Sequence, residues 1–195
     1  YYSNINNNYN LATWCKNESL SKLDNIHYNI DNRVLTLEFD DFLLVNSIVP
    51  ESDKLNSEKY KFREKWNSKF FDYIKKIKYE FIDKELIICG DMNVAHLDID
   101  IIFPESKKNK VAGFYDNERS DFAYLLELND LCDVYREINP YKKKSSFWIR
   151  ETYNQRKHSN GWRFDYFLTS ENILKRIVKW KIYKIMQKNH LRVRL

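Results

Sequence analysis

A carboxylate and an amide follow a short apolar segment near the middle of the chain. Residues 85–89 read ELIIC, and Gly90-Asp91-Met92-Asn93 comes directly after them. At the end of a strand, side chains two positions apart point to the same side, so Asp91 and Asn93 can face one cleft. There Asp91 could orient a water or protonate a leaving oxygen, and Asn93 could donate a hydrogen bond to a phosphoryl oxygen. The alternative is an ordinary turn in which the aspartate bonds the backbone that follows the strand.

A second carboxylate lies inside an aromatic segment, NGWRFDYF, at residues 160–167. A carboxylate among apolar side chains is costly unless it is paired, so Asp165 needs a partner such as a histidine or an arginine. A buried aspartate that holds a histidine in one tautomer recurs in catalytic sites, and His190 would be that histidine if it meets Asp165 in space. A structural ion pair between Asp165 and Arg163, or another cation, is the competing interpretation.

Two further groups could bind ligands. His96, Asp98 and Asp100 have an HxDxD spacing that could indicate a metal site, or residues that are solvated or support a site from behind. The aromatic residues Phe147, Trp148 and Trp162 lie among basic residues. Such a set could stack a base or line a sugar pocket beside a phosphate track, or could be core packing under a solvated basic rim.

The elements that must position these residues alternate between strands and helices. Residues 42–45 (FLLV) are continuously apolar, as in a strand buried on both faces. The 59–78 segment has apolar residues at spacings of three and four, which indicates an amphipathic helix with a basic outer face. Together the patterns predict an α/β fold with mixed sheets. Strands are expected at 28–30, 33–39, 42–49, 85–89, 132–136, 146–149, 163–168, 178–184 and 191–195, and helices at 59–78, 121–128 and 171–176, the last capped by Ser170.

Composition narrows the class of protein. The 195 residues suggest one domain or a large part of one, and a 43% hydrophobic content excludes a disordered chain. No apolar run approaches the 18 residues of a membrane span, and three widely spaced cysteines fit a reducing compartment. The net charge of +5 mildly favours a polyanionic partner. The three glycines, Gly90, Gly113 and Gly161, are so few that each is expected to mark a position that tolerates no Cβ.

These motifs, taken in order, resemble a known family. From about residue 28 to the C-terminus, the chain is similar to the exonuclease III-type AP (abasic-site) endonucleases of the endonuclease/exonuclease/phosphatase superfamily. The segments that carry the resemblance include all three glycines. They are RVLTLEFDDFLLVNSIVP, FREKW, LIICGDMNVAHLDID, AGFYDNER, SFW, NGWRFDYFLTS and the final segment around His190. Their forms are closer to the AP endonucleases than to inositol phosphatases, sphingomyelinases or deadenylases.

The resemblance implies a fold and an activity. The fold would be a four-layer α/β sandwich of two packed mixed sheets flanked by helices, here without its N-terminal strands. Residues 1–25 would form a loosely ordered, Asn-rich start, and 26–195 the C-terminal two-thirds of the domain. The activity would be hydrolysis of the phosphodiester 5′ to an abasic site in double-stranded DNA, with Mg²⁺ or alternatively Mn²⁺. The protein would be a monomer, with no membrane partner, inside the cell in the nucleus or an organelle.

The resemblance also implies roles for residues. The catalytic positions would be Asp91, Asn93, Asp165 and His190, and the metal ligands Asp91, Asn93 and Asn189. Substrate-binding positions would be Phe147, Trp162 and Phe164, which would wall the sugar pocket, together with Arg156.

Several positions depart from the family pattern. The upstream Asn and Gln-Glu pair of the family do not appear. Ile48 replaces a tyrosine, Glu51 and Val111 replace asparagines, and Asn189 replaces a metal-binding aspartate. A catalytically degenerate member that binds DNA or a protein is therefore the rival function. A phosphodiesterase for lipid or inositol phosphates is a third, which the Phe147–Trp162 pocket and its basic rim disfavour.

Overall fold

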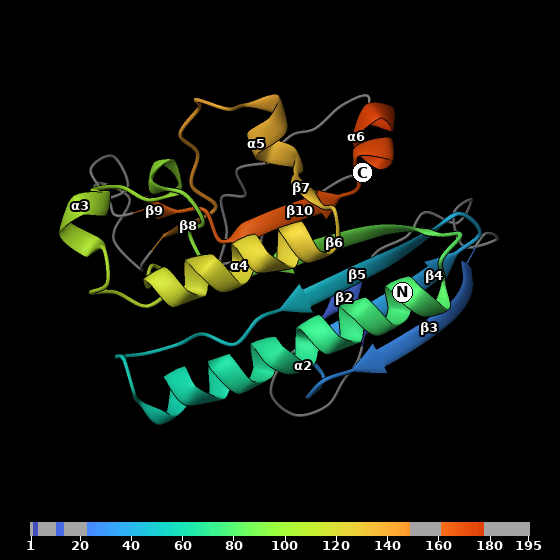
Figure 1. Cartoon of the computed structure of the whole chain (residues 1–195), viewed down its shortest axis with the longest axis horizontal. Coiled ribbons are helices and arrows are strands. Elements are labelled where there is room, and N and C mark those ends of the chain that lie inside the picture. The colour runs from blue at the N-terminus through green and yellow to red at the C-terminus, as the bar shows by residue number, and fades with distance from the viewer. Residues whose placement is uncertain (1, 4–10, 14–22, 149–160, 178–195) are drawn as a thin grey trace.

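The computed structural model describes residues 2–3, 11–13, 23–148 and 161–177. Its largest element is a six-stranded mixed sheet with the strand order β3-β4-β5-β6-β10-β7 (Figure 1). These strands are β3 (Leu23–Asn29), β4 (Val34–Phe39), β5 (Phe42–Ile48), β6 (Glu85–Asp91), β10 (Asp165–Thr169) and β7 (Cys132–Asp133).

The order of the strands brings distant parts of the chain together. β3, β4 and β5 pair antiparallel in sequence order, whereas β5 and β6 are parallel and are joined through helix α2 (Glu58–Glu80). β10 then returns antiparallel between β6 and β7. As a result, the last residue of β6, Asp91, lies directly opposite the first residue of β10, Asp165.

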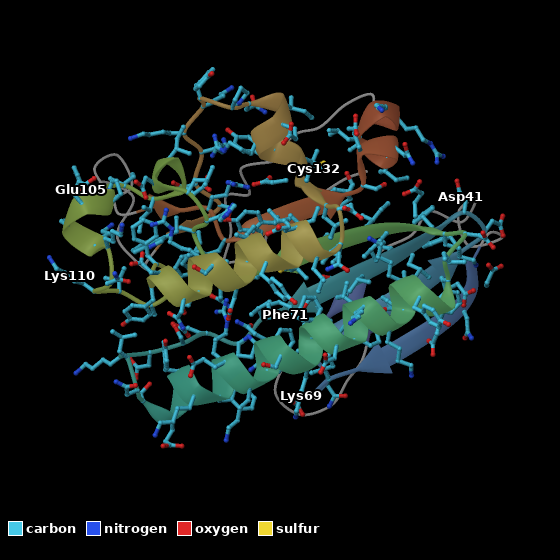
Figure 2. The ribbon with its side chains drawn as sticks, viewed as in Figure 1. Asp41, Lys69, Phe71, Glu105, Lys110 and Cys132 are labelled. Atoms are coloured by element: carbon cyan, nitrogen blue, oxygen red, sulfur yellow. The ribbon has the colours of Figure 1, made fainter. Side chains whose placement is uncertain are left out.

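Two helices cover one face of the sheet. α2 and α4 (Asp116–Leu128) lie side by side across it (Figure 1). Phe71 points from α2 toward α4, its ring 5.8 Å from that of Tyr124, while Lys69 lies on the exposed side (Figure 2). The core beneath contains Val45, Ile88, Trp66, Ile74 and Phe122. The basic outer face and apolar inner stripe predicted for this helix are confirmed.

The opposite face of the sheet is also buried. Because side chains alternate along a strand, Leu44 and Ile87 point to this face while their neighbours Val45 and Ile88 point to the helices. The second face packs against Leu11, against α5 (Val134–Ile138) and against α6 (Glu171–Arg176). This burial on both sides explains the continuously apolar 42–45 segment.

Smaller elements gather at one end of the sheet. The 3-10 helix η1 (Asp98–Asp100) and the short helix α3 (Pro104–Lys107) precede α4. β8 (Phe147–Trp148) pairs with β9 (Gly161–Trp162) near α3 (Figure 1). Elsewhere β1 (Tyr2–Ser3) pairs with β2 (Ala12–Thr13). The α/β class and the mixed sheet flanked by helices are confirmed. Of the two packed sheets expected, the described residues show one large sheet and these two short pairings.

Most predicted elements form, with shifted ends. α2 is longer than expected because Ser57 caps it, its hydroxyl accepting from the Tyr60 N–H, and α4 begins at Asp116 rather than 121. α6 and its Ser170 cap are as predicted. The strand predicted at 132–136 is wrong after Asp133, because the Asp133 carboxylate accepts from the Arg136 N–H and begins α5. The strands predicted at 178–184 and 191–195 lie outside the described residues.

Other expectations concern the whole chain. None of the helices that the structure describes combines the length and apolar composition needed to cross a bilayer. Cys89 and Cys132 are free thiols, and Cys15 is outside the described part. The division into a loose start at 1–25 and a domain at 26–195 stays a prediction.

Candidate functional site

Two aspartates form the centre of the candidate site. Asp91 and Asp165 are cross-strand partners in the β6–β10 ladder, and both are half-buried. Directly opposite residues on one face of an antiparallel pair have Cβ atoms about 5 Å apart, so the two carboxylates act on each other. We call them the strand-end pair.

Burial sets the protonation of the strand-end pair. It raises the pKa of Asp91 to about 6, although the Asn93 N–H and the charge of Arg63 oppose the rise and the charge of Glu51 adds to it. Burial also raises the pKa of Asp165 to about 7, with a further rise from the charge of Asp91 and a smaller opposing effect from Ser146. Two such acids cannot both ionise easily, so the pair favours a proton or a cation near neutral pH.

Asn93 is fixed by the turn that follows β6. Its backbone has a positive φ of 47°, and its N–H donates to Asp91 Oδ1 at 2.9 Å. Its side-chain Nδ2 donates to the Val49 carbonyl at 2.7 Å, while the Val49 N–H bonds the Asp91 carbonyl at 2.9 Å. The turn proposed as an alternative is therefore present, and it places Asn93 beside Asp91.

Two glycines make this geometry possible. A Cβ on Gly90, whose φ is 126°, would lie 2.0 Å from the Ser47 carbonyl oxygen on the neighbouring strand. A Cβ on Gly113, whose φ is 78°, would lie 2.7 Å from the Phe164 ring and 3.1 Å from the Asn93 carbonyl oxygen. The expectation that these scarce glycines mark positions without room for a side chain is confirmed for both.

Three aromatic rings adjoin the strand-end pair. Phe147 stacks on Phe164 with ring centroids 5.3 Å apart, and Trp162 lies 6.1 Å from Phe147 and 6.0 Å from Phe164. Trp162 and Phe164 are 5% and 7% exposed, whereas Phe147 is 39% exposed. The Met92 N–H donates to the Phe164 carbonyl at 2.8 Å, which ties this cluster to the turn after Asp91.

The aromatic cluster also carries a cation. The ammonium of Lys107 lies 4.4 Å from the centre of the Trp162 ring. The structure thus brings together Phe147, Trp162 and Phe164, the three residues that the family resemblance places around a sugar pocket. Trp162 is packed in a core, as in the core-packing interpretation, while Phe147 remains accessible.

The ion pair suggested between Arg163 and Asp165 is wrong. Arg163 is 0% exposed, and its guanidinium bonds both oxygens of Asp100, at 2.8 and 2.9 Å, and both of Asp133, at 3.1 and 2.6 Å. Arg136 adds a further bond to Asp100. Among the described residues, neither carboxylate of the strand-end pair has an ion pair with a cationic side chain.

The HxDxD segment is structural in the same way. Asp98 pairs with Arg119 at 2.9 Å, Asp100 pairs with the buried Arg163, and the His96 ring packs 5.0 Å from Phe122. Within the ranges described, no group of three or more His, Cys, Asp or Glu side chains is arranged to hold a metal ion. The supporting interpretation of Asp100 fits these contacts, and the metal interpretation of this segment does not.

Some predicted positions lie outside the described residues. His190, Asn189 and Arg156 are among them, so their roles stay predictions. Conversely, sequence reasoning missed Arg63 and Asp133. The sequence did carry a signal for Arg63. It lies three residues from both Tyr60 and Trp66, on the apolar face of the helix, where a charged side chain is rarely found unless it has a partner. Asp133 carried none, because its partner is 30 positions away.

Comparison with known proteins finds relatives that share part of their length with this chain. No family model matches the chain. It is 37% identical over 145 residues to a DNA-(apurinic or apyrimidinic site) endonuclease of Dictyostelium discoideum, covering 74% of this chain and 39% of that protein. It is 32% identical over 169 residues to an exodeoxyribonuclease of Bacillus subtilis, covering 85% of this chain and 65% of that protein.

A solved structure agrees with these relatives. An AP endonuclease from Archaeoglobus fulgidus superposes with a TM-score of 0.74 at 27% identity, covering 83% of this chain and 63% of that one. The chain therefore spans less than two-thirds of each of these three proteins. The shared sequence and fold show that this chain is homologous to part of the AP endonucleases and exodeoxyribonucleases of the exonuclease III type.

Proposed function

We propose that this chain forms part of a DNA-repair endonuclease that hydrolyses the phosphodiester 5′ to an abasic site. The observation that carries the proposal is the strand-end pair: Asp91 at the end of β6 and Asp165 at the start of β10, beside the aromatic cluster. Hydrolysis of a phosphodiester needs a group that moves protons, a group that offsets negative charge and a pocket that selects the substrate. This end of the sheet offers residues for each.

The donor set fits a divalent cation. Two half-buried carboxylates that face each other without a cationic partner in the described residues favour a positive charge between or beside them. Their ligand atoms are oxygens, which Mg²⁺ and Mn²⁺ prefer. Asp91 and Asn93 would hold the ion, with Asn189 as the further ligand that the family resemblance implies. The ion would offset charge on the phosphoryl oxygens and lower the pKa of a bound water.

The chain's own residues would handle the protons. With pKa values of about 6 and 7, the strand-end pair exchanges protons near neutral pH, where general acid–base catalysis is most effective. Asp165 would orient His190, which would accept the proton of the attacking water, or Asp91 would accept it directly. Since Val49 occupies one N–H of the Asn93 amide, the second N–H would donate to a phosphoryl oxygen.

The aromatic cluster would select the substrate. An abasic sugar has no base, so it leaves the duplex at low cost and enters a slot too narrow for an intact nucleotide. Phe147, Trp162 and Phe164 supply three apolar walls, and Gly113 lets the Phe164 ring approach the turn that carries Asn93. Arg156 would contact the DNA backbone. The proposal includes action as a monomer on double-stranded DNA, in the nucleus or an organelle.

The test is incision of a duplex that carries one tetrahydrofuran abasic analogue, by the full-length protein with Mg²⁺. We expect cutting 5′ to the analogue and its loss in Asp91→Asn, with Asp98→Asn as the matched control. Asp98 is an exposed aspartate that pairs with Arg119 away from the strand-end pair. Undiminished incision by Asp91→Asn would overturn the proposal.

One observation favours a second candidate, a DNA-binding module that does not cut. Ile48, which stands where the family has a tyrosine, is the direct neighbour of Asp91 in the β5–β6 register. A hydroxyl is therefore lost beside the proposed metal ligand. Tight binding of the abasic duplex without incision, and incision regained in Ile48→Tyr, would establish this candidate instead.

A further inference from the structure

One arginine of α2 is buried beneath the segment that carries Asp91 and Asn93. Arg63 is 3% exposed, although it lies on a helix whose other basic residues face outward. Burying a guanidinium is costly unless its N–H groups are all directed to acceptors. The identity of those acceptors indicates what Arg63 does.

The acceptors are mainly backbone carbonyls of two irregular segments. Arg63 Nη1 donates to the Pro50 carbonyl at 2.8 Å and to the Asn93 carbonyl at 3.2 Å, and Nη2 donates to the Met92 carbonyl at 2.9 Å. Pro50 follows β5, while Met92 and Asn93 follow β6. One guanidinium therefore joins the segments that follow β5 and β6, directly after Asp91 of the strand-end pair.

These carbonyls lie where the sheet ladder ends. Asp91 is the last residue of β6 that pairs with β5, and Asn93, two residues later, is in the left-handed backbone region. A planar fork with fixed donor directions suits carbonyls that diverge in this way, whereas a lysine ammonium is a single point of charge. The turn conformation and the shape of the arginine thus match.

A second set of contacts holds the arginine itself. Its Nε donates to Asn67 Oδ1 at 3.2 Å, and the Asn67 amide donates to Asp121 Oδ2 at 2.7 Å on α4. The buried Glu118 carboxylate lies 4.0 Å from Nη1 and accepts from the Ser52 hydroxyl and from the Tyr115 N–H at 3.1 Å. Arg63 is therefore fixed from both α2 and α4 before it reaches the turn.

We propose that Arg63 is a positioning residue: it fixes the 91–93 turn, and with it Asp91 and Asn93, against the segment that follows β5. The proposal rests on the proposed function for its effect on catalysis, but its structural part stands without it. Arg63 touches no reacting atom. A misplacement of catalytic groups by about 1 Å can cost about a hundredfold in rate, so looser holding lowers kcat more than it weakens DNA binding.

The experiment compares Arg63→Lys with Tyr73→Phe in the full-length protein. Tyr73 is a matched control because it is buried on the same helix and loses one buried hydrogen bond, to Thr36 at 2.7 Å, far from the turn. Amide exchange is followed in the peptide that spans 92–95, where Met92 and Ala95 donate to Phe164 and Gly113. Incision of the abasic duplex gives kcat and KM.

In Arg63→Lys we expect the amides of residues 92–95 to exchange at least tenfold faster than in the unaltered protein. We expect kcat to fall at least tenfold, and KM to change by less than about twofold. Tyr73→Phe should leave both quantities unchanged even if its melting temperature falls. Should Arg63→Lys not fold, Glu118→Gln removes the neighbouring charge, and it should speed exchange in the same peptide by a smaller factor.

Unchanged exchange at 92–95 in the variants would overturn the proposal, as would an increase no larger than in Tyr73→Phe. If the unaltered protein does not cut, the proposed function fails, and the exchange measurement still decides whether Arg63 holds the turn. Faster exchange with unaltered kcat would overturn the catalytic part alone.

Discussion

Two pairs of aspartates in this fold, one buried and one half-buried, are opposite in their electrostatics. Asp100 and Asp133 share the guanidinium of Arg163, with Arg136 as a second cation on Asp100; we call them the arginine-bound pair. Burial alone would raise the pKa of Asp100, but the hydrogen bonds and charge of Arg163, with the Leu97 N–H and Arg136, lower it overall. The strand-end pair has no such cation, and its pKa values are raised.

The difference shows how to separate a structural aspartate from a functional one. Both pairs are aspartates that are at least partly withdrawn from water, so residue type alone does not decide between the two roles. In the arginine-bound pair, the guanidinium of Arg163 already satisfies both carboxylates, and these bonds join η1, α5 and the 161–163 segment. In the strand-end pair neither carboxylate has a cationic partner among the described residues, so the pair can bind a proton or a metal ion.

The largest expected effect comes from breaking the arginine-bound pair. Arg163→Met leaves two buried carboxylates without their shared cation, which should lower the free energy of unfolding by about 3–5 kcal/mol. Urea unfolding measures this. Arg176→Met is the control, because its pair with Asp41 is exposed and should contribute less than about 1 kcal/mol. Equal losses in the two variants would show that the buried network carries no special stability.

Neutralising one acid of the strand-end pair should lower incision without lowering stability. Asp165→Asn removes a repelling charge, so stability at pH 8 should hold or rise, while incision should fall at least a hundredfold, or about 2.7 kcal/mol, because a proton-transfer group is lost. Unfolding and single-turnover incision are measured on the same sample. A marked loss of stability would mean that Asp165 is a structural residue with a hidden partner.

The pH dependence of stability should separate the pairs by sign. The ordinary pKa of an aspartate is 3.8, and those of Asp91 and Asp165 are about 6 and 7 in the folded chain. The folded state therefore binds more protons than the unfolded state in this range. The stability that these groups provide is present below about pH 4 and is lost as the pH rises through 6 and 7.

This contribution should amount to about 2 kcal/mol between pH 5 and pH 8, since one pKa unit corresponds to about 1.4 kcal/mol and the pair is only half-buried. It is measured, in EDTA, as the difference between the unaltered protein and the double variant Asp91→Asn/Asp165→Asn. The lowered pKa of Asp100 gives the reverse: its stability is present above about pH 4 and is lost as the pH falls further. A flat difference between pH 5 and 8 would contradict the raised pKa values.

Part of this contrast could be predicted from the sequence. Asp91 and Asn93 follow a clear apolar segment, so their place at the end of a strand could be predicted from the local pattern. Asp165 was expected inside a strand at 163–168, whereas β10 begins at Asp165. The partner of Arg163 could not be predicted in this way. The carboxylate nearest to it in sequence is Asp165, whereas its actual partner Asp100 is 63 positions away. Only the strand order β6-β10-β7 brings Asp133 to the arginine and Asp91 to Asp165.

The same limit applies to the end of the predicted strand at 132–136. Cys132 and Val134 fit a strand, and the helix begins at Asp133 through a capping bond that is weakly marked in sequence. The aromatic cluster was predicted as a set, yet its packing depends on Gly113, which is 51 positions from Phe164 in the sequence. A Cβ added at Gly113 would clash with the Phe164 ring. The pairing of Asp165 with His190 stays a prediction.

The smallest expected effect is that of the metal itself on stability. Asp91 is the charged residue among the proposed ligands, and Asn93 and Asn189 are neutral, so we expect Mg²⁺ to bind with a Kd on the order of 1 mM. At 10 mM Mg²⁺ and pH 8, such binding would stabilise the folded protein by about 1.4 kcal/mol, or about 3 °C in Tm. At pH 5 protons occupy the pair, and the shift should shrink toward zero. Asp91→Asn should abolish the shift at pH 8. Asp98→Asn should retain it, because Arg119 already engages the Asp98 carboxylate in the unaltered protein.

A shift of the same size in Asp91→Asn would place the ion elsewhere. Calorimetry that gave a sub-millimolar Kd would mean that another ligand completes the site, and Glu51, whose charge already acts on Asp91, is the first residue to replace in a search for it.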